Sequence, residues 1–181
     1  YAGANGVSAY GIIMYVSFIF VGVYLGYSVG TAPIIGYNYG AKNNEELKNV
    51  LNKSVKLLGI SAIILTLLSE IFAKPLASIF VSYDMDLFEM TTKAIKIFSI
   101  SYIISWFNIF ASSFFTALNN GLVSAIISFL RTLVFQIAMI YLLPIWWGLN
   151  GIWIAVLVAE ILSLFVSVGF LIKNKNKYGY I

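Results

Sequence analysis

The sequence predicts an all-α polytopic membrane protein, and two observations support this fold class. Of the 181 residues, 61% are hydrophobic and only 10% are charged, whereas soluble domains average about 45–50% apolar and about 25% charged residues. Long stretches without charge also recur along the chain, and a transmembrane helix needs about 20 mostly apolar residues. Too few charges remain to cover a soluble body of this size, so we expect the excess apolar surface to face lipid.

Five charge-poor segments long enough to cross a bilayer follow one another along the chain. They cover residues 11–35, 57–80, 95–118, 122–145 and 151–172. Short connections join them, and residues 1–10 read as the end of a preceding helix. The chain opens at Tyr1 rather than at a methionine, and five is an odd number of spans. We therefore expect a piece of a longer protein, with an upstream helix leading to Tyr1.

The lysines predict the orientation, because short cytoplasmic loops retain Lys and Arg. One side of the predicted bundle carries seven lysines, which are Lys42, Lys48, Lys53, Lys56, Lys173, Lys175 and Lys177. The other side carries Lys74, Lys93 and Lys96, which are offset by acidic residues. This asymmetry places the C-terminus in the cytoplasm of a multi-pass protein of the plasma (inner) membrane.

Three connecting regions carry further signals. Apolar residues recur at helical spacing between 43 and 58, with Asn43 as a candidate N-cap, which indicates an interfacial helix or an ordinary solvated connector. The acidic stretch of Asp84, Asp86 and Glu89 reads as an outer loop in which Asp86 caps the next helix. Three tryptophans are expected in the outer aromatic belt: Trp146, Trp147 and Trp153.

Small residues repeat every four positions in the first span. Gly22, Gly26 and Gly30 would place a face without side chains against a neighbouring helix, a pattern typical of close helix packing. Pro33 removes a backbone donor just afterwards and predicts a bend, which would serve either as a transport hinge or only as a packing feature.

Two charged residues fall near the middle of predicted spans. Glu160 lies nine residues after Gly151, and Arg131 lies about ten residues into the preceding antiparallel span. At 1.5 Å per residue their depths differ by only a few Å, so they can pair across adjacent helices. A buried carboxylate is costly unless it is paired, protonated or hydrated. The pair is therefore a candidate for the transport cycle, with a purely structural pair as the alternative.

The third span is unusually polar. Asn108 and Trp106 lie mid-span among several serines, which fits the wall of a water-filled cavity or, equally, interhelical hydrogen bonding. We include both residues among the candidates for a substrate or ion pathway.

The amino-acid composition excludes several classes of function. The chain has no cysteine and no histidine, so disulfides, thiolate nucleophiles, imidazole catalysis and zinc clusters are excluded. No catalytic constellation, metal site or cofactor motif is present, and the net charge of +4 does not indicate nucleic-acid binding. We expect a non-enzymatic protein.

Several ordered segments resemble one transporter family. The stretch Ala32-Pro33-Ile34-Ile35-Gly36-Tyr37-Asn38-Tyr39-Gly40-Ala41-Lys42 is similar to the end of the eighth helix of MATE (multidrug and toxic compound extrusion) transporters, especially the bacterial MepA-like branch. Ser128-Phe129-Leu130-Arg131, Leu142-Leu143-Pro144 and the stretch 148–160 look like the eleventh and twelfth helices. The resemblance covers nearly the whole chain, from the end of helix seven to the C-terminus.

The resemblance implies a C-terminal lobe, residues 1–181, of a twelve-helix monomer whose N-terminal lobe is absent. It also implies H⁺- or Na⁺-coupled antiport that exports hydrophobic organic cations by alternating access, in contact with the lipid bilayer. Some branches carry an acidic cation-binding residue in the tenth helix, but the corresponding Ser105, Trp106, Phe107 and Asn108 include none. Coupling in the absent N-lobe is therefore a further expectation.

Two alternatives remain beside the exporter. A flippase for lipid-linked oligosaccharides or lipids in the same superfamily would be expected to carry more cationic side chains in its cavity than Arg131 alone. A non-transporting membrane scaffold fits the composition but leaves the ordered motifs unexplained.

Overall fold

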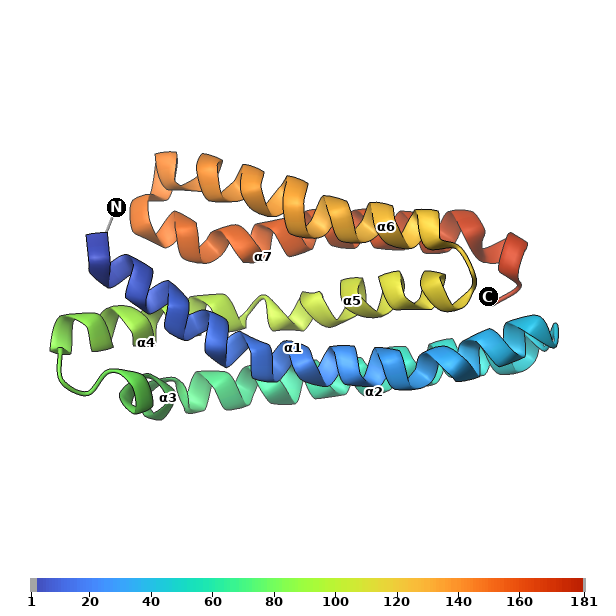
Figure 1. Cartoon of the computed structure of the whole chain (residues 1–181), viewed down its shortest axis with the longest axis horizontal. Helices are drawn as coiled ribbons and strands as arrows, with labels where there is room; N and C mark the ends of the chain where they lie inside the picture. Colours follow the sequence, from blue (N-terminus) through green and yellow to red (C-terminus); the bar gives the residue numbers. More distant parts are fainter. Residues whose placement is uncertain (1–2, 181) are drawn as a thin grey trace.

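The computed structural model describes residues 3–180, and all its regular elements are helical (Figure 1). In chain order they are α1 (Gly3–Gly40), α2 (Asn44–Ile71), α3 (Ala73–Phe80), α4 (Met85–Ser99), α5 (Tyr102–Ala117), α6 (Gly121–Phe129), the π-helix η1 (Leu130–Phe135) and α7 (Gln136–Tyr178). Helix α5 contacts α1, α2, α6 and α7, so it forms the centre of the bundle. We call the end that holds Tyr10 the N-side and the end that holds Tyr178 the C-side.

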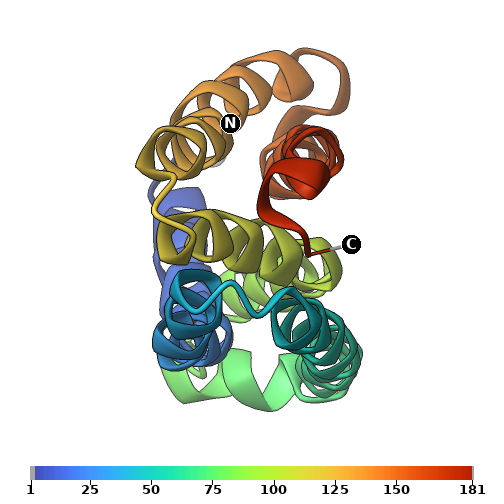
Figure 2. The same cartoon turned by 90° about the vertical axis from the view of Figure 1, so that its right-hand side faces the viewer.

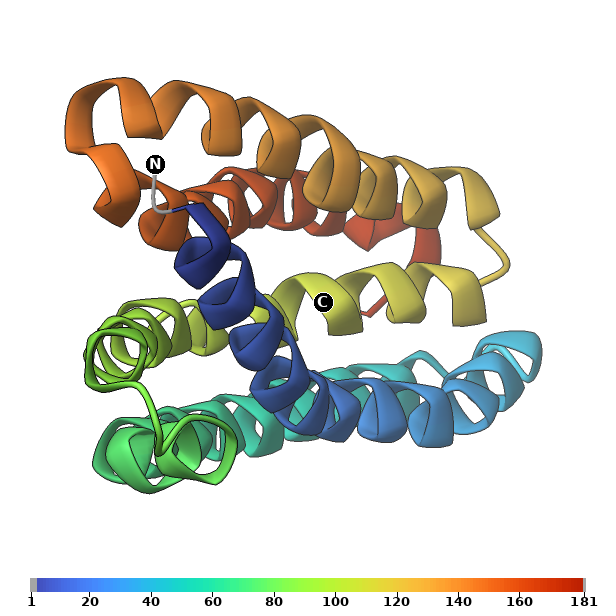
Figure 3. The same cartoon turned by 60° about the vertical axis from the view of Figure 1, so that its left-hand side comes forward.

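Three long helical segments and one bent pair of helices are candidate membrane spans, compared with the five passes predicted. The segments Gly3–Gly40, Asn44–Ile71 and Gly121–Tyr178 are each long and apolar enough to cross a membrane, and α4 with α5 qualifies as a bent pair. The segment Gly121–Tyr178 folds back on itself at Gly148, whose φ of 52° and ψ of −134° are non-helical (Figure 3). The two arms of this hairpin account for the fourth and fifth predicted spans.

Helix α1 starts earlier than predicted. Residues 3–10, expected to end a preceding helix, form the first turns of α1 without a break. The reason is local, because no proline or charged residue interrupts this stretch. The helix also continues through Pro33, beside Thr31, whose hydroxyl donates to the carbonyls of Tyr27 and Ser28 at 2.9 and 3.2 Å.

The second span is displaced toward the N-terminus of the chain. The expected interfacial helix at 43–58 is the first half of α2, which continues directly to Ile71. Asn43 does cap it, since its side chain accepts from the amide of Glu46 at 3.2 Å. The apolar stripe of this half packs inward, with Leu47 and Leu58 fully buried. Burial against the bundle therefore outweighs placement along a membrane surface.

The third span is broken rather than continuous. Helices α4 and α5 meet at an angle of 51°, although neither glycine nor proline occurs at the break. Hydroxyl groups instead compete for backbone carbonyls there. The Ser105 side chain donates to the Ser101 carbonyl at 2.8 Å, and the Tyr24 hydroxyl of α1 donates to the Tyr102 carbonyl at 3.4 Å. The sequence shows the serines but not the interruption that they stabilise.

Among the described residues, no helix packs on the glycine face of α1. A Cβ added at Gly22, Gly26 or Gly30 would meet no atom within 4 Å among the described residues outside its own helix. The close approach occurs instead at Gly36, where an added Cβ would lie 3.4 Å from the Ala117 carbonyl oxygen of α5. The four-residue spacing of the glycines identifies a helix face without side chains, but it cannot show which helix packs against that face.

Two predictions for the N-side need correction. The N-cap of α4 is Asp84, whose carboxylate accepts from the amide of Leu87 at 3.1 Å, and Asp86 lies in the first turn. Trp146 and Trp147 are exposed as expected of an aromatic belt, but Trp153 is buried and stacks against Tyr10. The backbone reversal at Gly148 explains this difference, since Trp153 follows it on the arm that packs into the bundle.

An aromatic cluster that the sequence did not predict lies at the C-side. After α7 the chain turns back toward α5 at Gly179, which has a left-handed φ of 68° (Figure 2). The Tyr180 ring then meets Phe114 of α5 edge-on at 5.1 Å, and its hydroxyl donates to the Leu171 carbonyl at 2.8 Å. Burial, and secondarily the neighbouring Tyr178, raises the pKa of Tyr180 above its ordinary value. This hydroxyl therefore remains a donor at physiological pH.

Candidate functional site

Arg131 and Glu160 form an ion pair inside the bundle, as their predicted depths suggested. Arg131 Nη2 lies 2.7 Å from Glu160 Oε1. Arg131 Nε donates to Oε1 at 2.9 Å and to Oε2 at 3.0 Å. The glutamate side chain is only 6% exposed and the arginine side chain 19% exposed. Both carboxylate oxygens are therefore engaged by the guanidinium, which offsets the cost of burying the negative charge.

Asn108 of α5 is the third member of this site. Its amide nitrogen donates to Glu160 Oε2 at 2.7 Å and to the Glu160 backbone carbonyl at 3.0 Å. Its side-chain oxygen accepts from the Ser167 hydroxyl at 2.8 Å. The network thus joins α5, η1 and α7, and each polar group of the fully buried Asn108 side chain has a partner.

The arginine is presented by an unusual segment. Residues Leu130–Phe135 form a π-helix between α6 and α7, and none of its residues is buried. A π-turn is a local insertion in a helix and often occurs at functional sites. It sets the direction from which Arg131 approaches the carboxylate, whereas Glu160 lies on a regular part of α7 packed against α5.

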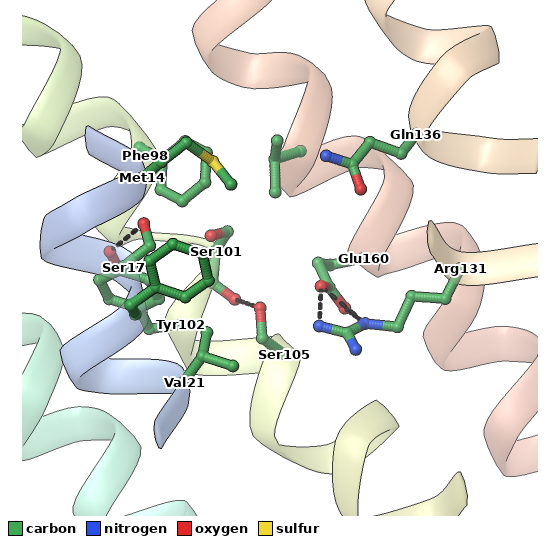
Figure 4. A pocket seen from close by; sticks show the side chains of 12 residues that line it. Met14, Ser17, Val21, Phe98, Ser101, Tyr102, Ser105, Arg131, Gln136 and Glu160 are labelled. Carbon is green, nitrogen blue, oxygen red and sulfur yellow. Dashed lines mark hydrogen bonds and ion pairs between the residues drawn. The ribbon is translucent and has the colours of Figure 1, made fainter. Parts of the chain in front are cut away.

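A cavity of about 180 Å³ with a mixed polar and apolar lining adjoins the ion pair (Figure 4). The Arg131–Glu160 pair and Gln136 lie on one side, facing α1 and the α4–α5 break on the other. The facing wall carries the polar side chains of Ser17, Ser101, Tyr102 and Ser105, and its apolar part includes Met14, Phe18, Val21 and Phe98. The volume is below the about 300–1,000 Å³ of a drug-sized site, but it is ample for water or a small cation.

On the facing wall, Ser101 and Ser105 belong to the third-span serines for which the sequence suggested a water-filled cavity, whereas Ser17 and Tyr102 were not predicted. Ser17 of α1 and Tyr102 share a hydroxyl–hydroxyl bond of 2.9 Å, and the Ser101 hydroxyl has no protein partner among residues 3–180. Tyr102 lies in the predicted third span, but its role depends on the helix break that turns it toward α1. Only the polarity of the 99–105 stretch could have signalled this wall.

Trp106 lies away from the network, although it was grouped with Asn108 in the sequence. Its indole nitrogen donates to the Ile103 carbonyl at 2.9 Å. Its ring faces Gly59 of α2, where an added Cβ would lie 3.5 Å from the indole. Asn108 follows Trp106 by two positions, which places the two side chains on different faces of α5. Pro33 and the three glycines at 22, 26 and 30 do not line the cavity either.

The fold and the site together define a polytopic helical membrane protein with an intramembrane charge network. The sequence profile of the MatE family matches residues 1–142, and the chain belongs to that family. No curated protein sequence matches the chain.

Solved structures share the fold at low sequence identity. An outward-facing multidrug resistance MATE family transporter of the MOP superfamily superposes with a TM-score of 0.91, at 21% identity over 99% of this chain. The inward-facing form gives 0.86, at 22% identity over 98%. The Vibrio cholerae MATE transporter VcmN in the bent form gives 0.87, at 22% identity over 97%. The chain spans 41% of the length of each of these structures.

Proposed function

We propose that this chain is part of a secondary transporter that exports hydrophobic organic cations in exchange for H⁺ or Na⁺. The observation that carries the proposal is the Arg131–Glu160–Asn108 network, which buries a carboxylate beside a cavity in a MatE-family fold. Intramembrane carboxylates commonly bind or relay cations. The existence of outward- and inward-facing relatives with this fold supports alternating access.

The network suggests how the coupling cation acts. Both oxygens of Glu160 are occupied by Arg131 and Asn108, so an incoming H⁺ or Na⁺ must compete with the guanidinium. We propose that cation binding releases Arg131 toward the cavity, where it is already 19% exposed. The π-helix that holds Arg131 supplies the element that shifts. The cavity is too small for the drug itself, which would bind where this bundle meets the remainder of a monomeric transporter.

The proposed setting is the plasma membrane, with the C-side facing the cytoplasm. The C-side carries the seven-lysine face, which matches the positive-inside rule. The flippase alternative is less well supported, because the one arginine at the cavity is already neutralised by Glu160. A lipid phosphate would find no free cationic partner on that wall.

The test is dye efflux from cells that express the complete gene with Glu160→Gln. Glutamine keeps the shape and still accepts from Asn108, but it cannot compete for a cation as a carboxylate does. We expect gradient-driven ethidium efflux to slow by about tenfold or more, within the range given by typical coupling free energies. Repeating the assay with a proton gradient or a sodium gradient alone identifies the coupling ion.

Glu45→Gln is the matched control, because Glu45 is exposed at the start of α2 and far from the network. Its efflux should equal that of the wild type. Membrane yield is measured for both variants. Normal efflux at normal yield for Glu160→Gln would remove the proposed role of the carboxylate, and absence of any gradient-driven efflux by the wild type would reject the export proposal.

A further inference from the structure

A basic pocket of about 300 Å³ lies on the N-side of the bundle, where α3 packs against α4 (Figure 1). One residue of α3 and five of α4 line it, which are Lys74, Phe88, Glu89, Thr92, Lys93 and Lys96. Three lysines and one glutamate give this lining a formal charge of +2. None of these residues lines the cavity beside the ion pair, so the basic pocket is a separate feature of the molecule.

The three lysines of the basic pocket have no carboxylate partner. Within residues 3–180 the Arg131–Glu160 contact is the only ion pair. Glu70 lies one helical turn before Lys74 in the sequence, but its carboxylate accepts from the Ser99 hydroxyl of α4 at 2.8 Å. Like charges gathered around one pocket repel each other, so an anion that enters it would be favoured electrostatically.

A buried hydroxyl group without a partner also lines this pocket. Thr92 is 8% exposed, and its hydroxyl has no hydrogen-bond partner among residues 3–180. A buried polar group in this state is costly and calls for a partner that the protein itself does not supply. A hydroxyl donor among ammonium groups matches the oxygens of a phosphate group, because these accept several charge-assisted hydrogen bonds at once.

Exposed apolar side chains begin just below the pocket, toward the middle of the bundle. The Thr66 hydroxyl of α2 donates to the Ser99 carbonyl at 3.4 Å, which places the end of α2 beside the end of α4. At this level Leu67 and Ile71 of α2 and Ile100 of α4 are all exposed. The pocket therefore lies where lipid-facing apolar surface gives way to lysines, which is the level of phospholipid headgroups.

We propose that the basic pocket binds a phosphate group, carried by an anionic phospholipid of the leaflet on the N-side. The Thr92 hydroxyl and the three lysines donate to the phosphate oxygens, and the acyl chains lie along the apolar surface of α2 and α4. Basic pockets between membrane helices bind anionic lipid headgroups in this way. This site goes beyond the proposed export and does not depend on it.

The experiment measures phosphatidylglycerol binding to the purified protein in detergent by native mass spectrometry, as a titration. Thr92→Val should weaken one binding step by about two- to tenfold, through loss of a hydrogen bond. Lys74→Gln and Lys96→Gln should each weaken the same step by about two- to fivefold, as expected for one exposed charge. Glu89→Gln should strengthen it by a similar factor, because it removes the repelling charge.

Two matched controls separate the pocket from helix packing and from general surface charge. Thr91→Val makes the same change at the adjacent residue, whose buried hydroxyl also lacks a partner but does not line the pocket. Lys53→Gln removes an exposed lysine on the C-side half of α2. Neither variant should change the step that Thr92→Val weakens. Thermal unfolding is measured for every variant, and the opposite signs expected at Lys96 and Glu89 cannot both arise from misfolding.

Further titrations identify the source of the phosphate. Phosphatidylcholine with the same acyl chains should bind more weakly, because its choline group offsets the negative charge, and inorganic phosphate should compete poorly. Inorganic phosphate that binds as tightly as the lipid, with the same loss in Thr92→Val, would overturn the assignment to a phospholipid. Equal phosphatidylglycerol affinity for the wild type, Thr92→Val and the two lysine variants would overturn the phosphate site altogether. So would an equal loss in Thr91→Val and Thr92→Val.

Discussion

Replacing Arg131 with methionine is expected to lower the free energy of unfolding by about 3–5 kcal/mol, the range typical for removing one partner of a buried ion pair. The Glu160 side chain is 6% exposed, so its negative charge would remain in the bundle with only the Asn108 amide as a donor. Methionine retains much of the apolar length of the arginine side chain, so the loss reports mainly on the charge. Thermal unfolding of the purified protein in lipid nanodiscs measures it.

The double variant Arg131→Met with Glu160→Gln is the internal control. It removes both charges and keeps an amide oxygen that can accept from Asn108, so most of the lost stability should return. Glu160→Gln alone should cost less than Arg131→Met, because the freed guanidinium can reach water in the adjoining cavity. A stability for Arg131→Met equal to that of the wild type would show that the pair does not hold these helices together.

A stability ranking of this kind also bears on mechanism. If the double variant regains stability but exports no dye, the network contributes to the transport cycle beyond its structural effect. If it regains both, the pair is a structural element, and the coupling carboxylate lies elsewhere in the protein. Measuring both the stability and the dye export of the double variant therefore distinguishes a structural ion pair from one that takes part in the transport cycle.

The sequence predicted the passes and the central ion pair because both depend on distance along a helix. A rise of 1.5 Å per residue places Arg131 and Glu160 at similar depth whatever the details of packing, and the structure places them in contact. The hydrogen bond between Asn108 and Glu160 could not be predicted from the sequence, because it depends on how α5 is rotated against α7. Trp106, two residues earlier, faces α2 instead.

Interruptions of helices were less predictable than the helices themselves. Pro33, which is expected to bend α1, does not interrupt the helix, whereas the break between α4 and α5 occurs at Ile100 and Ser101, without proline or glycine. Helix breaks in membrane bundles persist where other groups satisfy the freed backbone carbonyls. Those groups here include the Thr66 hydroxyl of α2, which donates to the Ser99 carbonyl at 3.4 Å, a tertiary contact that no local pattern reveals.

Replacing Gly151 with alanine is expected to destabilise the protein by about 3 kcal/mol, at the upper end of typical overpacking costs. A Cβ at this position would lie 2.6 Å from the Leu143 carbonyl carbon and 2.7 Å from the Pro144 nitrogen. These are backbone atoms of the opposite arm of the α7 hairpin, so no side-chain rotation can relieve the contact. The arm would have to move and would carry Trp153 and Glu160 with it.

Replacing Gly22 with alanine should stabilise the protein rather than destabilise it. An added Cβ there meets open space, and alanine is favoured over glycine within a helix by about 0.5–1 kcal/mol. The two variants differ by one methyl group each and require only thermal unfolding in nanodiscs. A Gly151→Ala protein as stable as Gly22→Ala would contradict the tight hairpin. Destabilisation by Gly22→Ala would instead indicate that another helix packs on the glycine face, as the sequence pattern predicted.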